Sequence, residues 1–308
     1  MIKTDKAVLH GAFPGLAPGS SGKGFILGIV AAVSYGTNPL FAVPLYARGM
    51  STESVLFYRY GLATLLLAGL MLLRGESFRL PRRAVAPMIV MGVVFALSSL
   101  LLFESYRLMD VGIASTLLFM EPVFLALIMR VVYGERLTKA TVASIAICMA
   151  GILLLCNPGP GAKVTAAGVA LVMLSALSYG IYMAMVNKSA AGRLAGMPLT
   201  FYSLLFGMIV FAAATRGFTT VQPVETTPTA LACVAGIALV PTIVSLVAVN
   251  VAIRNIGAVP VSILGALEPI TGALVGVGLF GEVLTPRGGF GMALIIGAVM
   301  LLVYTRRK

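Results

Sequence analysis

The chain has 308 residues, of which 59% are hydrophobic and 10% are charged, with a formal net charge of +12 and a mean hydropathy of +1.04. A soluble core of this length cannot bury so much apolar surface, so the composition excludes an ordinary soluble domain and indicates a bilayer protein. The excess positive charge lies in short segments between apolar runs, where it suits anionic lipid. We therefore expect membrane lipid, and not nucleic acid, as a partner.

The first 24 residues precede any apolar run. They contain Pro14, Pro18 and five glycines without helical periodicity, which predicts a disordered cytoplasmic N-terminal tail. Ten apolar segments follow, each close to the roughly 20 residues that a spanning helix needs. The first five are Phe25–Pro44, Ser54–Leu73, Ala84–Tyr106, Val111–Val132 and Thr138–Cys156, and the second five are Ala166–Val186, Pro198–Thr215, Pro228–Ile253, Pro260–Phe280 and Gly288–Tyr304. The sequence thus predicts an all-α polytopic membrane protein with ten transmembrane helices.

The second half of the chain repeats the first. Three motifs recur at offsets of 144 or 147 residues: Ser34–Gly36 as Ser178–Gly180, Glu121-Pro122 as Glu268-Pro269, and Gly134-Glu135 as Gly281-Glu282. The repeating unit, residues 25–156 and again 166–305, holds five helices. A unit that crosses the membrane an odd number of times must recur upside down, and inverted repeats of this kind are typical of transporters. We therefore expect two inverted five-helix repeats.

The charges between the predicted spans give an orientation. If the N-terminus is inside, sixteen lysines and arginines lie in inner segments and five in outer segments. This asymmetry follows the positive-inside rule. We expect both termini to be cytoplasmic and the protein to lie in a bacterial inner (plasma) membrane.

In its ten predicted spans and repeated motifs, the chain resembles the EamA-type exporters of the drug/metabolite transporter superfamily. The resemblance rests on the paired Glu-Pro motifs and on the Gly-Glu-x-Leu-Thr that follows each. Within the superfamily, the sequence is most similar to bacterial aromatic amino acid exporters. The resemblance implies a basket-shaped bundle in which helices 1 to 4 and 6 to 9 surround a central cavity and helices 5 and 10 are peripheral. It also implies export of amino acids or similar metabolites.

Two duplicated glutamates lie inside apolar runs. An acidic side chain at mid-membrane costs roughly 2.5 to 3.5 kcal/mol on insertion scales, so Glu121 and Glu268 need a reason to be there. One interpretation is that each carboxylate stabilises the helix break that the following proline creates. The other is that one or both bind a substrate ammonium or couple transport to protons. Glu135 and Glu282 are interpreted as structural, because a threonine suited to cap the next helix follows each.

Arg59 has no basic counterpart in the second half of the chain. It lies about five residues into the second predicted span, between Tyr58 and Tyr60, and the seventh span has no basic residue inside it. It could bind a substrate carboxylate through a bidentate contact. Alternatively, it could extend to the outer interface or pair with Glu104 or another helix.

Aromatic and small polar residues at helical spacing complete the candidate substrate site. Tyr35 and Asn38 share a face of the first span, Tyr179 and Tyr182 share one in the sixth, and Phe95, Ser99 and Phe103 share one in the third, while Tyr202 and Asn250 lie in the seventh and eighth. Ring faces suit an apolar side chain, and hydroxyl or amide groups suit its polar ends. The alternative is that these residues pack helices and hydrogen-bond across the bundle.

Prolines predict where the helices break or kink. They are Pro39, Pro122, Pro241, Pro260 and Pro269. Pro241 has no counterpart in the third span, so the eighth is expected to bend where its partner does not.

The residues that the chain lacks narrow the function. The only histidine is His10, the only aspartates are Asp5 and Asp110, and no nucleotide-binding or hydrolase motif occurs. The three cysteines lack the spacing of metal ligands: Cys148, Cys156 and Cys233. Together with the missing motifs, this spacing leads us to expect no enzymatic activity, no metal and no cofactor. The inverted repeats predict a transporter that works by alternating access, as a monomer or homodimer, and the resemblance implies that it exports amino acids, aromatic and other neutral ones, or similar small metabolites. A proton-coupled multidrug or cation exporter and a channel or pore remain alternatives.

Overall fold

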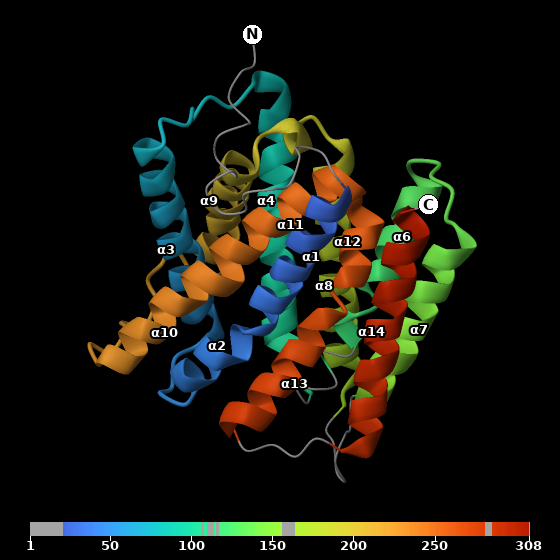
Figure 1. Cartoon of the computed structure of the whole chain (residues 1–308). Coiled ribbons are helices and arrows are strands. Elements are labelled where there is room, and N and C mark those ends of the chain that lie inside the picture. Colours follow the sequence, from blue (N-terminus) through green and yellow to red (C-terminus); the bar gives the residue numbers. More distant parts are fainter. Residues whose placement is uncertain are drawn as a thin grey trace.

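The protein is a helical bundle (Figure 1). The computed structural model describes residues 21–105, 108–109, 114, 117–155, 164–280 and 285–307, and every regular element within these ranges is a helix. The first half contains α1 (Ser21–Gly36), α2 (Asn38–Tyr46), α3 (Thr52–Leu73), α4 (Arg82–Ser105), α6 (Glu121–Val131) and α7 (Lys139–Leu155). The second half contains α8 (Ala166–Lys188), η1 (Ala191–Arg193), α9 (Gly196–Ala214), α10 (Pro228–Ala238), the π-helical segment η2 (Leu239–Val244), α11 (Ser245–Ile256), α12 (Ala258–Leu264), α13 (Leu267–Phe280) and α14 (Pro286–Arg307).

Eight stretches of these helices are long and apolar enough to cross a membrane, counting only the described residues. Residues 139–154 form a shorter apolar helix in α7. The predicted fourth span lies partly outside the described residues, and its described second half is α6. Residues 1–20 of the predicted tail also lie outside them, whereas α1 begins at Ser21 and so includes the last four tail residues. The fold is that of a multi-pass, all-α membrane protein.

Hydroxyl side chains start several of the long helices. Thr138 and Thr285 accept hydrogen bonds from the backbone N–H groups of Thr141 and Gly288, each at 3.1 Å. Such caps satisfy donors that the first turn of a helix leaves free and typically stabilise it by about 1 kcal/mol. The two caps predicted from the repeated Leu-Thr pairs are therefore confirmed. Ser51, Thr165 and Thr227 cap α3, α8 and α10 in the same way.

Prolines mark the interruptions, as predicted. The first span breaks at Thr37, and α2 carries Pro39 in its first turn. α6 and α13 begin at the two Glu-Pro pairs, where a missing N–H does not disturb the helix. The eighth span passes through the π-helical segment η2 at Pro241, while α4 runs unbroken. The predicted difference between these two spans is confirmed.

The helices pack in pairs across the two halves. α4 lies against α8 and α9, α1 against α11 and α13, α3 against α9, and α6 against α8 (Figure 1). α7 and α14 pack on each other at one edge of the bundle. Their backbones meet closely there, since a Cβ added at Gly151 would lie 2.7 Å from the Gly291 carbonyl oxygen.

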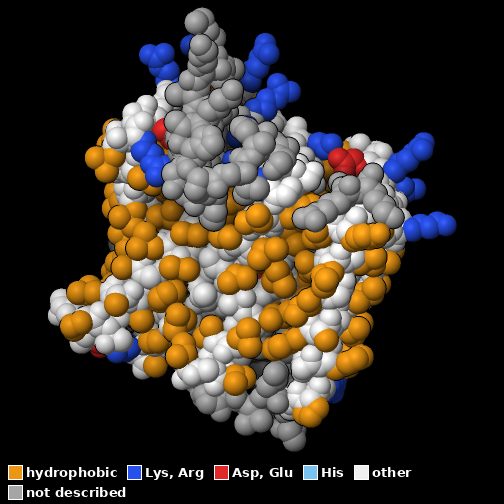
Figure 2. Space-filling view, viewed as in Figure 1, with side chains coloured by type: hydrophobic (Ala, Val, Ile, Leu, Met, Phe, Trp, Pro, Cys, Tyr) orange, Lys and Arg blue, Asp and Glu red, His pale blue; other side chains and the backbone are white. Residues whose placement is uncertain are grey.

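The two ends of the bundle differ in charge. α1 begins and α14 ends at one end, and lysine and arginine side chains gather there above a broad apolar band (Figure 2). We call this the charged end. The basic residues that flank several helices lie at this end. They are found at the end of α3, the start of α4, the end of α6 and the end of α8: Arg74, Arg82, Arg83, Arg130 and Lys188. The distribution matches the charge asymmetry seen in the sequence.

Candidate functional site

An aromatic cluster occupies the middle of the bundle. Phe95 of α4 lies 4.9 Å from the ring of Tyr182 and 6.1 Å from that of Tyr179, both on α8, measured between ring centroids. Tyr60 of α3 lies 5.7 Å from Phe95 and 4.7 Å from Phe211 of α9. Tyr179 and Tyr182 are nearly parallel, with 8° between their planes. The predicted face of Phe95 and the predicted face of Tyr179 and Tyr182 therefore meet.

A hydrogen-bonded chain fixes one side of this cluster. The Tyr182 hydroxyl donates to Asn250 Oδ1 at 3.0 Å, and Asn250 Nδ2 donates to Thr200 Oγ1 at 3.0 Å. Thr200 in turn donates to the Gly196 carbonyl at 2.8 Å. These side chains join α8, α11 and α9 and are fully buried. Tyr182 and Asn250 thus hold helices together, which fits the packing interpretation of both.

Arg59 is fully buried and docks on the π-helical segment η2. Its Nε donates to Thr242 Oγ1 at 2.7 Å, and Nη2 donates to the Pro241 carbonyl at 3.4 Å. Its Cζ lies 5.4 Å from the centre of the Tyr35 ring. Nη1 has no hydrogen-bond partner among the described residues. The arginine therefore contacts another helix, as one of the two interpretations requires, and still has donor capacity free.

Asn38 lies where α1 gives way to α2. Its Nδ2 donates to the Tyr35 carbonyl at 2.9 Å, which is the acceptor that Pro39 cannot satisfy because proline has no N–H. Its Oδ1 is buried without a hydrogen-bond partner in the described part of the chain. The amide thus stabilises the break and leaves one acceptor free beside Tyr35.

Glu121 begins α6 and reaches across to the second half. Ser262 of α12 donates to its Oε2 at 2.6 Å, while Oε1 is buried without a partner among the described residues. Glu268, its repeat counterpart at the start of α13, is half-buried and close enough for the two charges to interact. Tyr179 lies within electrostatic range of both glutamates and of Tyr35. The duplicated glutamates therefore border the aromatic cluster.

Two repeated glycines bring the glutamate backbones close to the first helix of the other half. A Cβ at Gly36 would lie 2.6 Å from the Glu268 carbonyl oxygen. A Cβ at its counterpart Gly180 would lie 3.7 Å from the Glu121 carbonyl oxygen. The close approach requires a glycine at Gly36, whereas at Gly180 a Cβ would be in ordinary van der Waals contact.

The remaining predicted residues lie further from this region or only support it. Ser99 hydrogen-bonds the Tyr60 hydroxyl at 2.9 Å and so fixes a member of the cluster. Phe103, near the end of α4, packs its ring edge-on against Tyr46, with centroids 6.3 Å apart. Tyr202 lies near the charged end, where its hydroxyl donates to the Phe78 carbonyl in the loop between α3 and α4. Phe103 and Tyr202 are not brought into the aromatic cluster.

A pair of aromatic residues on α3 holds the loop between α9 and α10. We call Phe57 and Tyr58 with this loop, residues 215–227, the first anchor. The Tyr58 hydroxyl donates to the Gln222 carbonyl at 2.9 Å, and the Phe57 ring lies 5.2 Å from that of Phe218. Gln222 also accepts a hydrogen bond from the Ser51 backbone.

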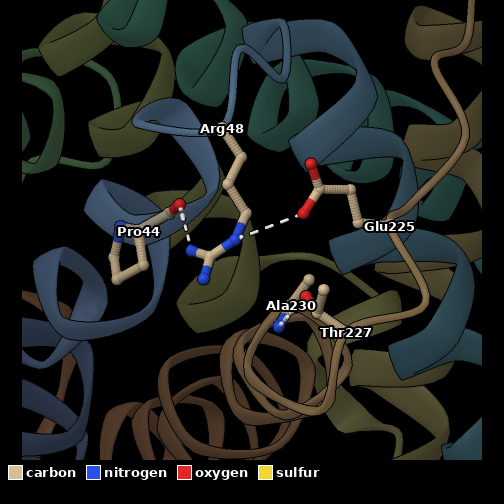
Figure 3. Close-up of polar contacts among 5 residues, drawn as sticks. All are labelled: Pro44, Arg48, Glu225, Thr227 and Ala230. Atoms are coloured by element: carbon tan, nitrogen blue, oxygen red, sulfur yellow. Dashed lines mark hydrogen bonds and ion pairs between the residues drawn. The ribbon is translucent and has the colours of Figure 1, made fainter.

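An ion pair lies beside the first anchor. Arg48 contacts Glu225 at 3.4 Å and donates to the Pro44 carbonyl at 2.8 Å, next to the Thr227 cap of α10 (Figure 3). Both side chains are partly exposed. The ion pair joins the end of α2 to the same loop.

A second pair on α9 does the same at the charged end. Phe201 and Tyr202 with the loop of residues 74–81 form what we call the second anchor. The Phe201 ring lies 5.4 Å from that of Phe78, whose carbonyl accepts the Tyr202 hydroxyl. These two residues stand 144 positions after Phe57 and Tyr58. The sequence interpretation missed this recurrence, although the same offset had already appeared at the Ser-Tyr-Gly motif.

Sequence reasoning also missed the partners of the charged groups. Neither Ser262 nor Thr242 was singled out from the sequence. Both lie far along the chain from the charges they contact, Glu121 and Arg59. The one available signal for Thr242 was its place directly after Pro241, where a proline inside a long apolar helix loosens the backbone.

A multi-pass helical bundle with charged and aromatic side chains buried at its centre is the architecture of a membrane transporter. Residues 22–157 and 166–304 match the profile of the EamA-like transporter family, and the chain belongs to this family. Membership in a transporter family places the protein in a class that is not enzymatic.

Two curated proteins are similar to the chain. One is an uncharacterized transporter of Archaeoglobus fulgidus, 30% identical over 192 residues, which are 62% of this chain and 67% of that protein. The other is a probable terminal-alkyne amino-acid exporter of Streptantibioticus cattleyicolor, 26% identical over 230 residues, which are 73% and 75% of the two chains.

A solved structure has a similar fold. A crystal structure superposes with a TM-score of 0.76 over 94% of this chain and 99% of that chain, at 19% identity. At that level of identity, the likeness supports the fold alone.

Proposed function

We propose that this transporter exports neutral amino acids, aromatic ones among them, or similar small metabolites by alternating access across a bacterial inner membrane. The observation that carries the proposal is the aromatic cluster, which lies beside the polar atoms of Arg59, Asn38 and Glu121 that have no partner among the described residues. The relative named as an amino-acid exporter supports it. The sequence resemblance to the bacterial aromatic amino acid exporter YddG points the same way.

Within this proposal, the candidate residues divide by what they contact. Tyr35, Asn38, Arg59, Phe95 and Tyr179 would contact the substrate, because they border the cluster and several keep polar atoms free. The other candidates would position them. Ser99, Tyr182 and Asn250 bond neighbouring helices, and Phe103 and Tyr202 act nearer the ends of the bundle.

Paired contacts support ten spans arranged as two inverted repeats. The approach of Gly36 to Glu268 mirrors that of Gly180 to Glu121, and the first anchor mirrors the second at the opposite end of the bundle. The packing of α4 on α8 likewise mirrors that of α1 on α11. An inverted repeat accounts for each of these, because it exchanges the halves and turns the membrane sides over.

Thiol labelling tests the proposed topology. The cysteines would first be replaced, and single cysteines would then be placed at Gly75, Arg193, Gly49 and Gly217. In intact cells, an impermeant thiol reagent should label the last two and spare the first two, because the charged end is proposed to face the cytoplasm. Labelling of the Gly75 and Gly217 positions, which follow equivalent helices of the two halves, from the same side would contradict the inverted arrangement.

A proton-coupled multidrug or cation exporter is the second candidate function. The specific observation in its favour is the pair of interacting carboxylates, Glu121 and Glu268, at the centre of the bundle. A buried acidic pair can bind an organic cation or a proton. If Glu121→Gln with Glu268→Gln left transport and its pH dependence unchanged, coupling through these groups would be excluded.

Counterflow in proteoliposomes tests the main proposal. Vesicles containing the full chain are preloaded with unlabelled phenylalanine, tryptophan, threonine or a quaternary ammonium drug, and uptake of radiolabelled phenylalanine is followed without a pH gradient. Preloaded aromatic amino acids should drive accumulation and the cation should not. Drug movement on an imposed proton gradient, without any amino-acid exchange, would instead establish the second candidate.

A further inference from the structure

Arg59 and Glu121 are buried without a charged partner in the part of the chain that the structure describes. The Arg59 side chain is 0% exposed and contacts the Thr242 hydroxyl, the Pro241 carbonyl and Tyr35, all of them uncharged groups. Glu121 is 6% exposed and accepts one hydrogen bond, from Ser262. Buried charges in membrane proteins are costly and normally pair with each other or with a ligand. A ligand of opposite charge would therefore stabilise each of them in its charged form.

Each charge keeps one terminal atom free, and the two atoms are chemically complementary. Nη1 of Arg59 carries two N–H donors and can accept no hydrogen bond. Oε1 of Glu121 is a carboxylate oxygen, which accepts when ionised. A ligand that satisfies both must bring an anionic acceptor at one end and a cationic donor at the other.

Aromatic side chains connect the two charges. Tyr35 lies under the Arg59 guanidinium, with 5.4 Å from Cζ to the ring centre. Tyr179 lies within electrostatic range of Tyr35, Glu121 and Glu268, so the basic and the acidic group border one aromatic region. Glu268 adds a second carboxyl group within electrostatic range of Glu121, so a cation bound there would interact with both.

The role of Arg59 in docking α3 on η2 does not by itself require a charge. A neutral donor could satisfy the Pro241 carbonyl and the Thr242 hydroxyl. The equivalent position in the second half is Ser203, whose hydroxyl donates to the Leu199 carbonyl of its own helix. The second half therefore packs without a positive charge at this position.

We propose that the centre of the bundle recognises the zwitterionic headgroup of an α-amino acid, with the Arg59 guanidinium binding the carboxylate and Glu121, assisted by Glu268, binding the ammonium. This inference rests on the proposed amino-acid export and assigns the chemistry by which that site selects its substrate. The guanidinium offers a charge-assisted hydrogen bond to the carboxylate. The Phe95 and Tyr179 rings, which pack on each other with centroids 6.1 Å apart, would offer an apolar surface to the substrate side chain.

Three related compounds separate the two ends of the headgroup. Phenylalanine carries both charges, 3-phenylpropanoate lacks the ammonium, and phenethylamine lacks the carboxylate. In counterflow with the wild-type chain, preloaded phenylalanine should drive uptake of the labelled amino acid at least tenfold better than either analogue. Equal efficiency of all three would overturn the zwitterion inference and leave amino-acid export intact. Exchange with no amino acid at all would overturn the proposed function itself.

Two variants test which residue binds the carboxylate and which binds the ammonium of the headgroup. Arg59→Gln keeps a donor for η2 and removes the charge, so counterflow driven by phenylalanine should fall at least tenfold and counterflow driven by phenethylamine should change less than twofold. In Glu121→Gln, counterflow driven by phenylalanine should also fall at least tenfold, whereas counterflow driven by 3-phenylpropanoate should be unchanged. Arg74→Gln, an exposed arginine at the end of the same helix, is the matched control and should leave the order of the three compounds as in the wild type.

A folding readout accompanies each variant. The labelling of the buried thiols Cys148 and Cys233 by a thiol-reactive dye on heating reports unfolding, and only variants that unfold like the wild type are compared. If Arg59→Gln fails this check, Arg59→Lys replaces it and should retain phenylalanine transport within about tenfold, because the charge is kept. Folded variants that lose all three compounds equally, or that keep the wild-type order, would overturn the assignment.

Discussion

The first and second anchors are two copies of one device at opposite ends of the bundle. In each, a tyrosine hydroxyl bonds a backbone carbonyl of the facing loop, and the preceding phenylalanine packs on a phenylalanine of that loop. The copies differ in the next residue, which is Arg59 after the first pair and Ser203 after the second. They also differ in support, because the ion pair of Arg48 with Glu225 joins the first loop. The Phe-Tyr pairs that both anchors contain tie the loops to the helices, whereas Arg59, which only the first anchor has beside it, lies at the candidate site.

The largest expected difference between the anchors is in ring burial. Phe201 is 8% exposed, whereas Phe57 is only half-buried. Phe201→Ala should lower the free energy of unfolding by about 3 to 5 kcal/mol, the usual range for a buried phenylalanine, and Phe57→Ala by clearly less. The measurement is SDS titration of both purified variants. Equal losses would mean that the two rings are equally buried in the membrane.

Replacing the residue that follows each Phe-Tyr pair tests the functional difference between the two anchors. Arg59→Ser makes the first copy like the second and should reduce amino-acid counterflow at least tenfold, equivalent to about 1.4 kcal/mol, because the free Nη1 donor is lost. Ser203→Ala removes a bond within its own helix and should leave counterflow within twofold of the wild type. A larger transport loss in Ser203→Ala would reverse our assignment of function to the copy with the arginine.

Removing single hydroxyls tests the loop contacts. Tyr202→Phe and Tyr58→Phe each lose one hydrogen bond, with typical net values of about 0.5 to 1.5 kcal/mol. The loss should be greater for Tyr202, because Gln222 in the first loop has further bonds from Ser51 and to Ser54. Hydrogen exchange should rise in residues 74–81 in the first variant and hardly change in residues 215–227 in the second. Faster exchange in residues 215–227 would show that Tyr58 alone holds the first loop.

The smallest effect should come from the ion pair beside the first anchor. Arg48 and Glu225 are partly exposed, and ion pairs of this kind are typically worth about 0.2 to 1 kcal/mol. Glu225→Gln should lower stability within this range at low salt, and the loss should diminish in 0.5 M NaCl because salt screens exposed charges. A loss that does not depend on salt would point to packing instead of charge.

The sequence predicted the helices better than the contacts between them. Apolar runs located the eight membrane-length stretches of the described residues, prolines located the breaks at Pro39 and Pro241, and repeated threonines predicted the caps of α7 and α14. Each of these properties depends on neighbours in the chain. The site depends on pairs such as Arg59 with Thr242, which are 183 residues apart. No local pattern encodes such a pair.

The candidate site was predicted in part for the same reason. Helical spacing correctly grouped Tyr179 with Tyr182, since residues three apart share a face. It also grouped Phe103 with Phe95, although α4 is long enough that residues two turns apart meet different neighbours. The sequence showed which faces are aromatic, and only tertiary packing decides which of those faces meet.

The π-helical segment η2 connects the length of the second repeat to the position of Arg59. The offset between the halves grows from 144 at Phe57 and Phe201 to 147 at Arg107 and Arg254, so the second half is three residues longer in between. A π-helical turn closes over one residue more than an α-helical turn, so η2 accommodates one extra residue without ending the helix. The same turn presents the Pro241 carbonyl and the Thr242 hydroxyl to the arginine. The π-helical segment of one half and the arginine of the other are therefore complementary, although α4 has no such segment and Ser203 stands where the second half would carry an arginine.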